Sequence, residues 1–268
     1  SSLQVEQGST VAEVAKQISM GLFRNAVGGL VDGEVADLRQ PLEKDCSLEI
    51  LTFEDAAGKR VFWHTASHVL AQAVQHLFPG VKFAIGPAID GGFYYDFDVE
   101  KPFTTEDLEK IEAEMKKIAK EALPLERFEL DPGEAKEHAG KGEKISFFKQ
   151  GDFTDLCAGP HLMDTSKVKA VKLTSATGAY WRGDSEKAML CRIYGTAFPK
   201  ASLLEEHLAL LEEAKKRDHR KLGKELELFD IFEEGPGFPV FLPKGMALRN
   251  TLEGYWRELH RKAGYLEI

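Results

Sequence analysis

Residues 64–78, HTASHVLAQAVQHLF, have the pattern of a helix, and Pro79-Gly80 ends it. Two imidazoles stand four residues apart, at about 0° and 40° on a projection of 100° per residue. The apolar residues of the segment fall between about 140° and 280°. We therefore expect His64 and His68 side by side on the face turned away from the core. If His64 lies in the first turn, the helix dipole disfavours its protonated form, and a neutral imidazole serves as a base or ligand.

A second polar motif follows at residues 155–161, DLCAGPH. Its Gly159-Pro160 step predicts a turn and not a helix interior. With the helical pair, Cys157 and His161 would complete a set of three imidazoles and one thiol, which is a chemically sensible zinc site. A zinc-dependent hydrolase and a zinc-stapled domain therefore stay open, beside the interpretation of the helical histidines as ordinary surface residues.

Residues 1–55 predict a small α+β module. Thr10 and Glu13 have capping-box spacing ahead of an apolar helical stretch, which Gly21 is expected to end. Asp32-Gly33 is a strong hairpin signal. The strands expected in this module cover residues 25–31, 34–38 and 48–53.

A larger α+β region is expected between residues 61 and 199. Thr104 and Asp107 can cap an amphipathic helix that runs to Ala122. The strands expected in this region include residues 85–89, 93–97, 144–148, 170–173 and 188–194.

Beyond this region the pattern predicts two helices. Ser202 and Glu205 have capping-box spacing at the start of one continuous helix that extends to Lys224. An amphipathic helix is expected over residues 246–263, after a stretch rich in glycine and proline. The expected fold class is α+β, with a mainly antiparallel sheet and a helix that carries the HxxxH pair.

Composition excludes several classes of protein. The 268 residues are 43% hydrophobic and 29% charged, which is enough for about two domains and a sizeable core. The sequence has no run of about 20 apolar residues and no signal-peptide pattern, so membrane, collagen-like and disordered classes are excluded. Three widely spaced cysteines form no disulfide framework and indicate a reducing compartment, for which we expect the cytoplasm.

The formal net charge of −9 argues at first against a nucleic-acid partner. Residues 1–55, however, hold four basic and ten acidic residues, so 4 − 10 = −6 of that charge lies there. Residues 214–224 hold six basic residues and one acidic residue. A locally basic helix is usually a solvated face, but it can also contact phosphates.

Three runs of the sequence are long and specific: HTASHVLAQAVQHLFPGVKFAIGPAIDGGFYYDFD (64–98), DLCAGPH (155–161) and TGAYWRGDSEKAMLCRIYGTAFP (177–199). They resemble the editing domain of the threonyl-tRNA synthetase family, and alanyl-tRNA synthetase editing domains share the HxxxH and CxxxH pairs more distantly. The resemblance covers the length of the chain. It implies a ubiquitin-like (β-grasp) TGS module at 1–55 with an incomplete first strand, a tRNA-editing domain at 61–199, a linker helix at 200–224 and the beginning of a class II aminoacylation domain at 225–268.

This resemblance implies hydrolysis of mischarged seryl-tRNA(Thr) after transfer. Full-length enzymes of the family join threonine to tRNA(Thr) with ATP. Serine lacks only one methyl group of threonine, worth about 1–3 kcal/mol of discrimination, so a second site must remove it. Ester hydrolysis needs a positioned water, a base and donors for the oxyanion.

The family's editing residues match positions in this chain. His64 and His68 would position or activate water, and Asp155 and His161 would hold the substrate amine and that water. Cys157 would line the pocket and not attack, because the family works without a covalent intermediate and nothing obvious lowers the pKa of its thiol.

Other expected site residues match the family less closely. Lys144 is the best candidate for its catalytic lysine, but the stretch 127–153 is shorter than the family pattern. Gly86 would let the backbone approach the substrate, and Tyr95 would line the pocket or simply pack within its strand. Ala158 stands where the family commonly has an arginine.

Contacts with tRNA are expected at two further places. Tyr180, Trp181 and Arg182 would stack on the 3′-terminal adenine and contact phosphate, unless Trp181 is core and Arg182 forms a salt bridge. The basic helix supplies the other expected contacts: Lys215, Lys216, Arg217, Arg220, Lys221 and Lys224.

The resemblance implies no cofactor for editing, although the HxxxH and CxxxH residues can also hold zinc. ATP, Mg and Zn would serve a catalytic domain beyond Ile268, so we expect a fragment that forms no threonyl adenylate. The expected partners are tRNA(Thr) and its 3′-terminal aminoacyl-adenosine, and no membrane. The full-length enzyme is expected to be a homodimer and this chain a monomer. A non-catalytic RNA-binding or regulatory module is the third hypothesis.

Overall fold

The computed structural model describes residues 2–130, 145–180, 189–233 and 235–267. It divides into two compact units, Ser1–Leu204 and Glu205–Ile268. The expected TGS module and the expected editing domain both lie in the first unit. No helix among the described residues is both long and apolar enough to cross a membrane.

Two short helices open the first unit. Helix α1 (Val11–Ile18) begins at Thr10, whose side chain and that of Glu13 form the predicted capping box. The prediction that Gly21 ends this helix is wrong. Ser19 ends it, because the Ser19 hydroxyl accepts a hydrogen bond from the Leu22 N–H and thereby starts α2 (Met20–Asn25).

The sheet of this module is antiparallel, with strand order β2-β1-β3. The predicted hairpin is confirmed, since Asp32 and Gly33 both adopt a positive φ, 50° and 88°, at its tip. The three strands are β1 (Ala26–Val31), β2 (Glu34–Ala36) and β3 (Leu48–Thr52).

Helix α3 (Ala56–Leu77) carries the HxxxH pair and contacts strands of all three sheets in the first unit. It begins eight residues before His64, which therefore lies in its third turn and not in the first. The predicted effect of the helix dipole on His64 is thus wrong. The expectation that the histidines face away from the core is wrong for His68, because strands cover that side and leave it only 3% exposed.

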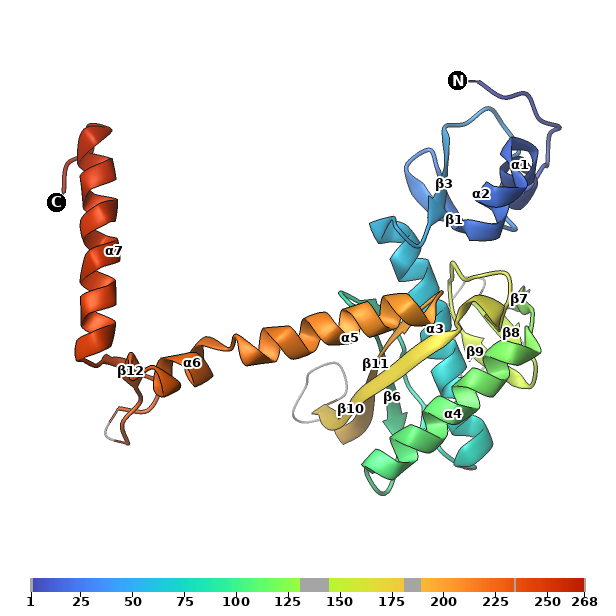
Figure 1. The fold of residues 1–268 in the computed structure, drawn as a ribbon. Helices are drawn as coiled ribbons and strands as arrows, with labels where there is room; N and C mark the ends of the chain where they lie inside the picture. The colour runs from blue at the N-terminus through green and yellow to red at the C-terminus, as the bar shows by residue number, and fades with distance from the viewer. Residues whose placement is uncertain (1, 131–144, 181–188, 234, 268) are drawn as a thin grey trace. The chain divides into compact units, whose positions relative to one another are not determined.

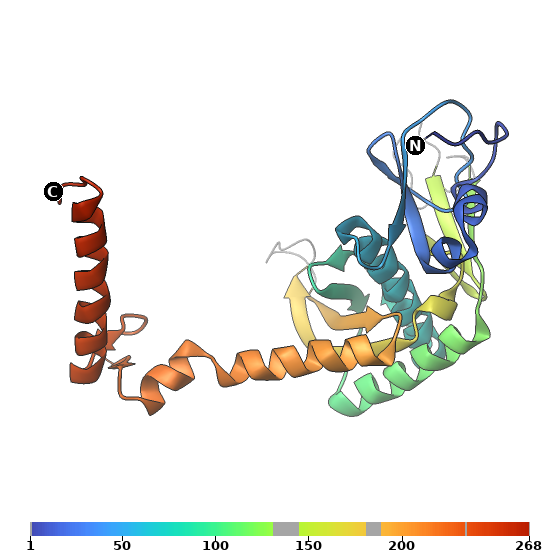
Figure 2. The ribbon, with the colours of Figure 1, turned by 45° about the horizontal axis from the view of Figure 1, so that its top comes forward.

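The largest sheet has strand order β10-β11-β6-β4, with β5 also paired to β6, and every pairing is antiparallel. Helices α3 and α4 pack side by side against it (Figures 1 and 2). The predicted Thr104–Asp107 capping box starts α4. The elements are β4 (Lys82–Phe83), β5 (Ala88–Ile89), β6 (Gly92–Asp98), α4 (Thr105–Glu121), β10 (Ala170–Tyr180) and β11 (Met189–Phe198).

A third antiparallel sheet, β7-β8-β9, also contacts α3. Its last strand runs directly into the DLCAGPH segment. The elements are β7 (Leu125–Leu130), β8 (Ile145–Gln150), β9 (Phe153–Leu156) and the short helix η1 (Thr165–Lys167).

Helix α5 (Ala201–Lys216) crosses the division between the units. The prediction of one continuous helix to Lys224 is wrong, because Asp218 caps a separate helix, α6 (His219–Glu225), through the Arg220 N–H. Ser202 lies inside α5 and is not its N-cap. The second unit also holds β12 (Phe229–Asp230), β13 (Val240–Phe241) and α7 (Pro243–Lys262).

His76, near the end of α3, ties three elements of the first unit together. Its Nδ1 lies 3.1 Å from Glu114 of α4, and its Nε2 lies 3.1 Å from Asp152 in the turn between β8 and β9. Burial alone would lower the pKa of His76, but the hydrogen bonds to Asp152 and Glu114 outweigh it and raise that pKa.

We predict that His76→Ala lowers the free energy of unfolding by about 1 kcal/mol at pH 6. The folded-state pKa of His76 is raised, so its charged contribution is fully present below about pH 6.5 and is lost as the pH rises through the folded-state value. Urea unfolding of both proteins from pH 5.5 to 9 measures this. Gln75→Ala, a neighbour that donates to the Asp152 carbonyl, should change stability equally at every pH. A pH-independent effect of His76→Ala would contradict the prediction.

Candidate functional site

The two sequence motifs meet in space. His64, His68, Cys157 and His161 each offer one metal-ligand atom, and these atoms all lie within 4.8 Å of one another. Cys157 Sγ is 3.3 Å from His64 Nε2 and 3.2 Å from His161 Nε2. Asp155 adds a carboxylate oxygen 3.6 Å from His68 Nε2. Five of the six predicted catalytic residues therefore form one cluster.

The turn after β9 brings Cys157 and His161 onto the same side. Gly159 adopts φ 75°, which favours glycine, and its N–H donates to Cys157 Sγ at 3.3 Å. A Cβ at this position would lie 2.9 Å from the ring of Phe148. The backbone of Cys157 is fixed by Ser146, whose hydroxyl donates to the Cys157 carbonyl at 2.8 Å. The turn therefore needs glycine for both its conformation and its packing.

Thr65 fixes the ring of His161. Thr65 Oγ1 lies 3.2 Å from His161 Nδ1 and donates to the Val61 carbonyl at 3.2 Å, and it accepts from the Leu162 N–H at 2.9 Å. A hydroxyl has one proton to give, and a carbonyl can only accept. The hydrogen-bond network therefore assigns the Nδ1–H tautomer to His161. Its Nε2 is left as an acceptor toward the thiol of Cys157.

Burial keeps the histidines of the cluster neutral. Desolvation, with a smaller contribution from the neighbouring His68, lowers the pKa of His64 to about 3, and desolvation lowers that of His68 to about 3. His161 is fully buried, and desolvation and the two neighbouring imidazoles hold its pKa well below the ordinary value. The neutrality predicted from the helix dipole is thus present for a different reason, the removal of water.

The acids of the cluster shift in the opposite direction. Burial raises the pKa of the Cys157 thiol to about 11, so sulfur is protonated at neutral pH. Burial also raises the pKa of Asp155, and the hydrogen bond from Tyr95 partly offsets this effect. Both shifts favour the protonated acids, and Asp155 supplies the carboxyl group of the cluster.

Tyr95 reaches the cluster from β6. Its ring is fully buried and stacks on Phe97 at 5.0 Å between centroids, while its hydroxyl donates to Asp155 Oδ2 at 2.7 Å. A Cβ on Gly86 would lie 2.1 Å from Tyr95 Cδ2, and the Gly86 carbonyl accepts from Ser67 Oγ at 2.5 Å. Packing against Tyr95 thus requires glycine at position 86, which the sequence interpretation had assigned to contact with substrate.

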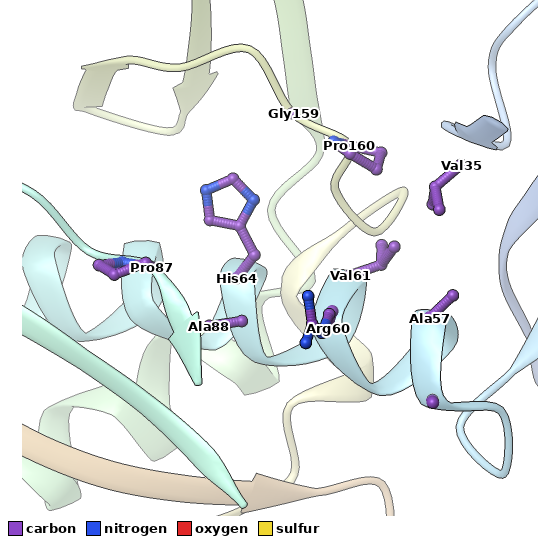
Figure 3. Close-up of a pocket in the computed structure, with 10 residues that line it drawn as sticks. Val35, Ala57, Arg60, Val61, His64, Pro87, Ala88, Gly159 and Pro160 are labelled. Atoms are coloured by element: carbon purple, nitrogen blue, oxygen red, sulfur yellow. The ribbon is translucent and has the colours of Figure 1, made fainter. Parts of the chain in front are cut away.

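A cavity of about 580 Å³ opens beside the cluster. In Figure 3, His64 rises from α3 between Pro87 and Pro160. The walls of the cavity are mostly apolar, with Arg60 as the charged side chain among them. Val35 of the N-terminal module also contributes to these walls. The cavity lining is Val35, Ala56, Ala57, Arg60, Val61, His64, Pro87, Ala88, Gly159 and Pro160.

The cluster also fits a zinc ion by donor chemistry. Three imidazoles and a thiolate are common zinc ligands, and tetrahedral bonds of 2.0–2.3 Å place ligand atoms about 3.3–3.7 Å apart. The two distances from Cys157 Sγ, 3.2 and 3.3 Å, lie at or just below that range, and the four ligand atoms together lie within 4.8 Å of one another. Four protein ligands would fill a tetrahedral ion and leave no position for water, which is the arrangement of structural zinc.

Three predicted site residues lie outside the described part of the chain: Lys144, Trp181 and Arg182. Tyr180 ends β10 in the first unit. Four of the six basic residues predicted to contact tRNA pair with acidic neighbours, and three of those neighbours lie outside residues 214–224, where the charge count did not include them. These pairs are Lys215–Glu212, Arg217–Glu213, Arg220–Asp218 and Lys221–Glu225.

The sequence interpretation missed Thr65, Asp37 and Arg39. Thr65 stands between the two histidines of the motif, so its place on the same helix was a usable signal. Asp37 accepts a hydrogen bond from the His161 N–H at 3.3 Å across 124 residues of sequence, and Arg39 donates to the carbonyls that follow. No local pattern marks such a distant contact.

Comparisons with known proteins give a consistent result. Residues 1–52 match the TGS domain, and residues 145–194 match the Threonyl and Alanyl tRNA synthetase second additional domain. Over 99% of its length, the chain is 60% identical to the threonine–tRNA ligase of Acetivibrio thermocellus. It is 59% identical to those of Caldanaerobacter subterraneus subsp. tengcongensis and Clostridium botulinum (strain Langeland), again over 99% of its length. The chain spans 44% of each relative.

We predict that Gly86→Ala lowers the free energy of unfolding by about 1–3 kcal/mol, because the new methyl group forces the buried ring of Tyr95 to move. The movement should also lengthen the contact between Tyr95 and Asp155. Denaturant unfolding measures the first effect. Gly21→Ala is the control, since its nearest neighbour would be Ser19 Oγ at 3.9 Å. A change below about 0.5 kcal/mol in Gly86→Ala would show that the site tolerates the methyl group.

Proposed function

Because this chain belongs to the threonyl-tRNA synthetase family, we propose that its His–Cys–Asp cluster hydrolyses the ester bond of seryl-tRNA(Thr). The observation that best supports this proposal is that three neutral imidazoles, a thiol and one carboxylate lie together beside an apolar cavity. We propose further that the chain is part of an enzyme that joins threonine to tRNA(Thr) with ATP.

The reaction needs a water that attacks the ester carbonyl carbon. His64 borders the cavity and lies near His68, so both can accept hydrogen bonds from that water and orient it. A proton taken up by His68 would form an imidazolium 3.6 Å from Asp155, whose carboxylate stabilises it. The tetrahedral intermediate then releases serine, and the proton passes to the ribose oxygen of the tRNA.

Recognition of the amino acid follows from charge. The substrate carries an α-ammonium group, and Asp155 is the carboxylate at the cluster. Tyr95 holds one oxygen of that carboxylate at 2.7 Å and thereby fixes its orientation. We assign the substrate amine to Asp155, with His161 beside it, as the family resemblance implies. Rejection of threonine requires the site to exclude one methyl group, which supplies about 1–3 kcal/mol.

Cys157 is proposed as a wall of the site and not as a nucleophile. Its pKa of about 11 leaves almost no thiolate at neutral pH. Water is therefore the attacking group. No acyl-enzyme forms, and one hydrolytic step completes the reaction.

A zinc-stapled domain is the second candidate, and the donor set favours it. His64, His68, Cys157 and His161 would hold the ion. Bound zinc would supply charge and rigidity, and its closed coordination would take both water-orienting histidines out of use. Hydrolysis and zinc binding at these four residues are thus competing outcomes.

We also propose the boundaries expected from the family: a TGS module at 1–55, the editing domain at 61–199, a linker at 200–224 made largely of α5 and α6, and a class II domain from 225. The phosphate-contacting role of the basic residues in α5 and α6 belongs to this proposal. Their ion pairs with Glu212, Glu213, Asp218 and Glu225 predict weaker attraction for phosphate than the sequence count alone indicates.

We predict that the chain deacylates seryl-tRNA(Thr) faster than threonyl-tRNA(Thr), and that His64→Ala lowers the rate by about 10²–10⁴-fold. Release of labelled serine from charged tRNA measures both. His68→Gln tests the second histidine with less risk to folding, because its side chain is buried. His260→Ala, in α7, is the matched control and should leave the rate unchanged. Equal rates for all four proteins would favour the non-catalytic RNA-binding module.

A separate prediction addresses the metal. Hydrolysis should continue at the same rate after treatment with a chelator, because the proposed mechanism orients water with neutral imidazoles and uses no metal. Elemental analysis of the purified chain, combined with the serine-release assay before and after chelation, measures this. Stoichiometric zinc together with a rate that falls on its removal would overturn the metal-free mechanism.

A further inference from the structure

Two residues just after the N-terminal hairpin reach the segment that carries His161. Asp37 follows β2, and its Oδ2 accepts a hydrogen bond from the His161 N–H at 3.3 Å. Its other oxygen, Oδ1, accepts from the Arg39 N–H at 2.9 Å and from Arg39 Nη1 at 2.6 Å. One carboxylate therefore binds the backbone of a cluster residue and an arginine of its own module.

Arg39 extends this connection along the same segment. Its Nη2 donates to the carbonyl oxygens of Leu162 at 2.8 Å and of Met163 at 2.7 Å. The side chains of Asp37 and Arg39 are 15% and 28% exposed, so water competes weakly for these bonds. A planar guanidinium with fixed donor directions holds three acceptors in a defined arrangement, which a flexible ammonium does not.

Other contacts hold the same segment against the module. Met163 packs on the small core of the module that includes Leu38 and Leu42. Lys167 Nζ donates to the carbonyl of Ala26, at the start of β1. Residues 161–167 are thus attached to the N-terminal module by both polar and apolar contacts.

His161 is consequently held from two sides. Thr65 of α3 binds its ring nitrogen Nδ1, whereas Asp37 binds its backbone N–H. Its Nε2 lies 3.2 Å from Cys157 Sγ, so a shift of the backbone would move the imidazole within the cluster. A displacement of about 1 Å in a catalytic group can lower a rate a hundredfold.

We propose that Asp37 and Arg39 are positioning residues for His161, and that the N-terminal module is thereby part of the editing site and not only a separate binding unit. Neither residue needs to touch the substrate. The kinetic part of this proposal rests on the proposed hydrolysis of seryl-tRNA, while its structural part, the dependence of His161 on Asp37, does not.

The test uses the whole 268-residue chain. Asp37→Ala should lower kcat for deacylation by about tenfold to a hundredfold with KM within twofold, because the substrate contacts remain. Asp37→Asn keeps one of the two accepting oxygens and turns an NH2 group toward either Arg39 or the His161 N–H, so its kcat should fall between those of Asp37→Ala and the wild type. Arg39→Lys should also lower kcat, but by less than Asp37→Ala does. Arg24→Ala, which changes an arginine of the same module in α2, should leave kcat unchanged.

The His161 amide provides a readout that does not depend on activity. In ¹⁵N-histidine spectra its resonance should move in Asp37→Ala and move less in Asp37→Asn, which keeps one accepting oxygen. Rates are normalised to the folded fraction from circular dichroism, so a loss of stability alone does not lower them. Unchanged kcat together with an unmoved His161 resonance would overturn the proposal. A wild-type chain without deacylase activity would instead refute the proposed function, and the resonance would still decide the role of Asp37.

Discussion

The burial of α3 is the constraint on which the rest of the first unit depends. From Val61 to Val74 every residue except His64 is buried, because strands of three sheets and helix α4 surround the helix. An ionised imidazole in such a place would need a compensating partner, so the three histidines lose their protons. The same enclosure brings the 155–161 turn against the helix. Burial therefore determines both the positions and the protonation states of the cluster.

Much of the fold could be predicted from local sequence. Capping boxes at Thr10 and Thr104, the Asp32-Gly33 hairpin and the antiparallel α+β class all follow from short-range chemistry, and the structure agrees. Element boundaries were less predictable, because Ser19 and Asp218 each start a new helix where the pattern indicated a glycine stop or a continuous helix. Side-chain capping overrode the apolar period at both places.

The candidate site was predictable in its composition but not in its environment. Spacing and resemblance indicated that His64, His68, Cys157 and His161 would come together, and they do. The helical projection placed the histidines on a solvent face because a single helix carries no information about the sheet that covers it. Thr65 was within reach of sequence reasoning, whereas Asp37 was not, since its partner lies 124 residues away.

The bond between Asp37 and the His161 backbone also limits how this protein can be recombined. Residues 1–55 have their own sheet and their own small core, so they resemble a module that could be replaced by the matching module of a relative. A chimaera joined at residue 55 would retain the three histidines of the cluster and yet inherit Asp37 and Arg39 from another parent. The position of His161 in such a chimaera would depend on whether that parent's hairpin fits the carbonyls of Leu162 and Met163. The unit of exchange is therefore a pair of distant segments, and the evident domain border is a poor crossover point.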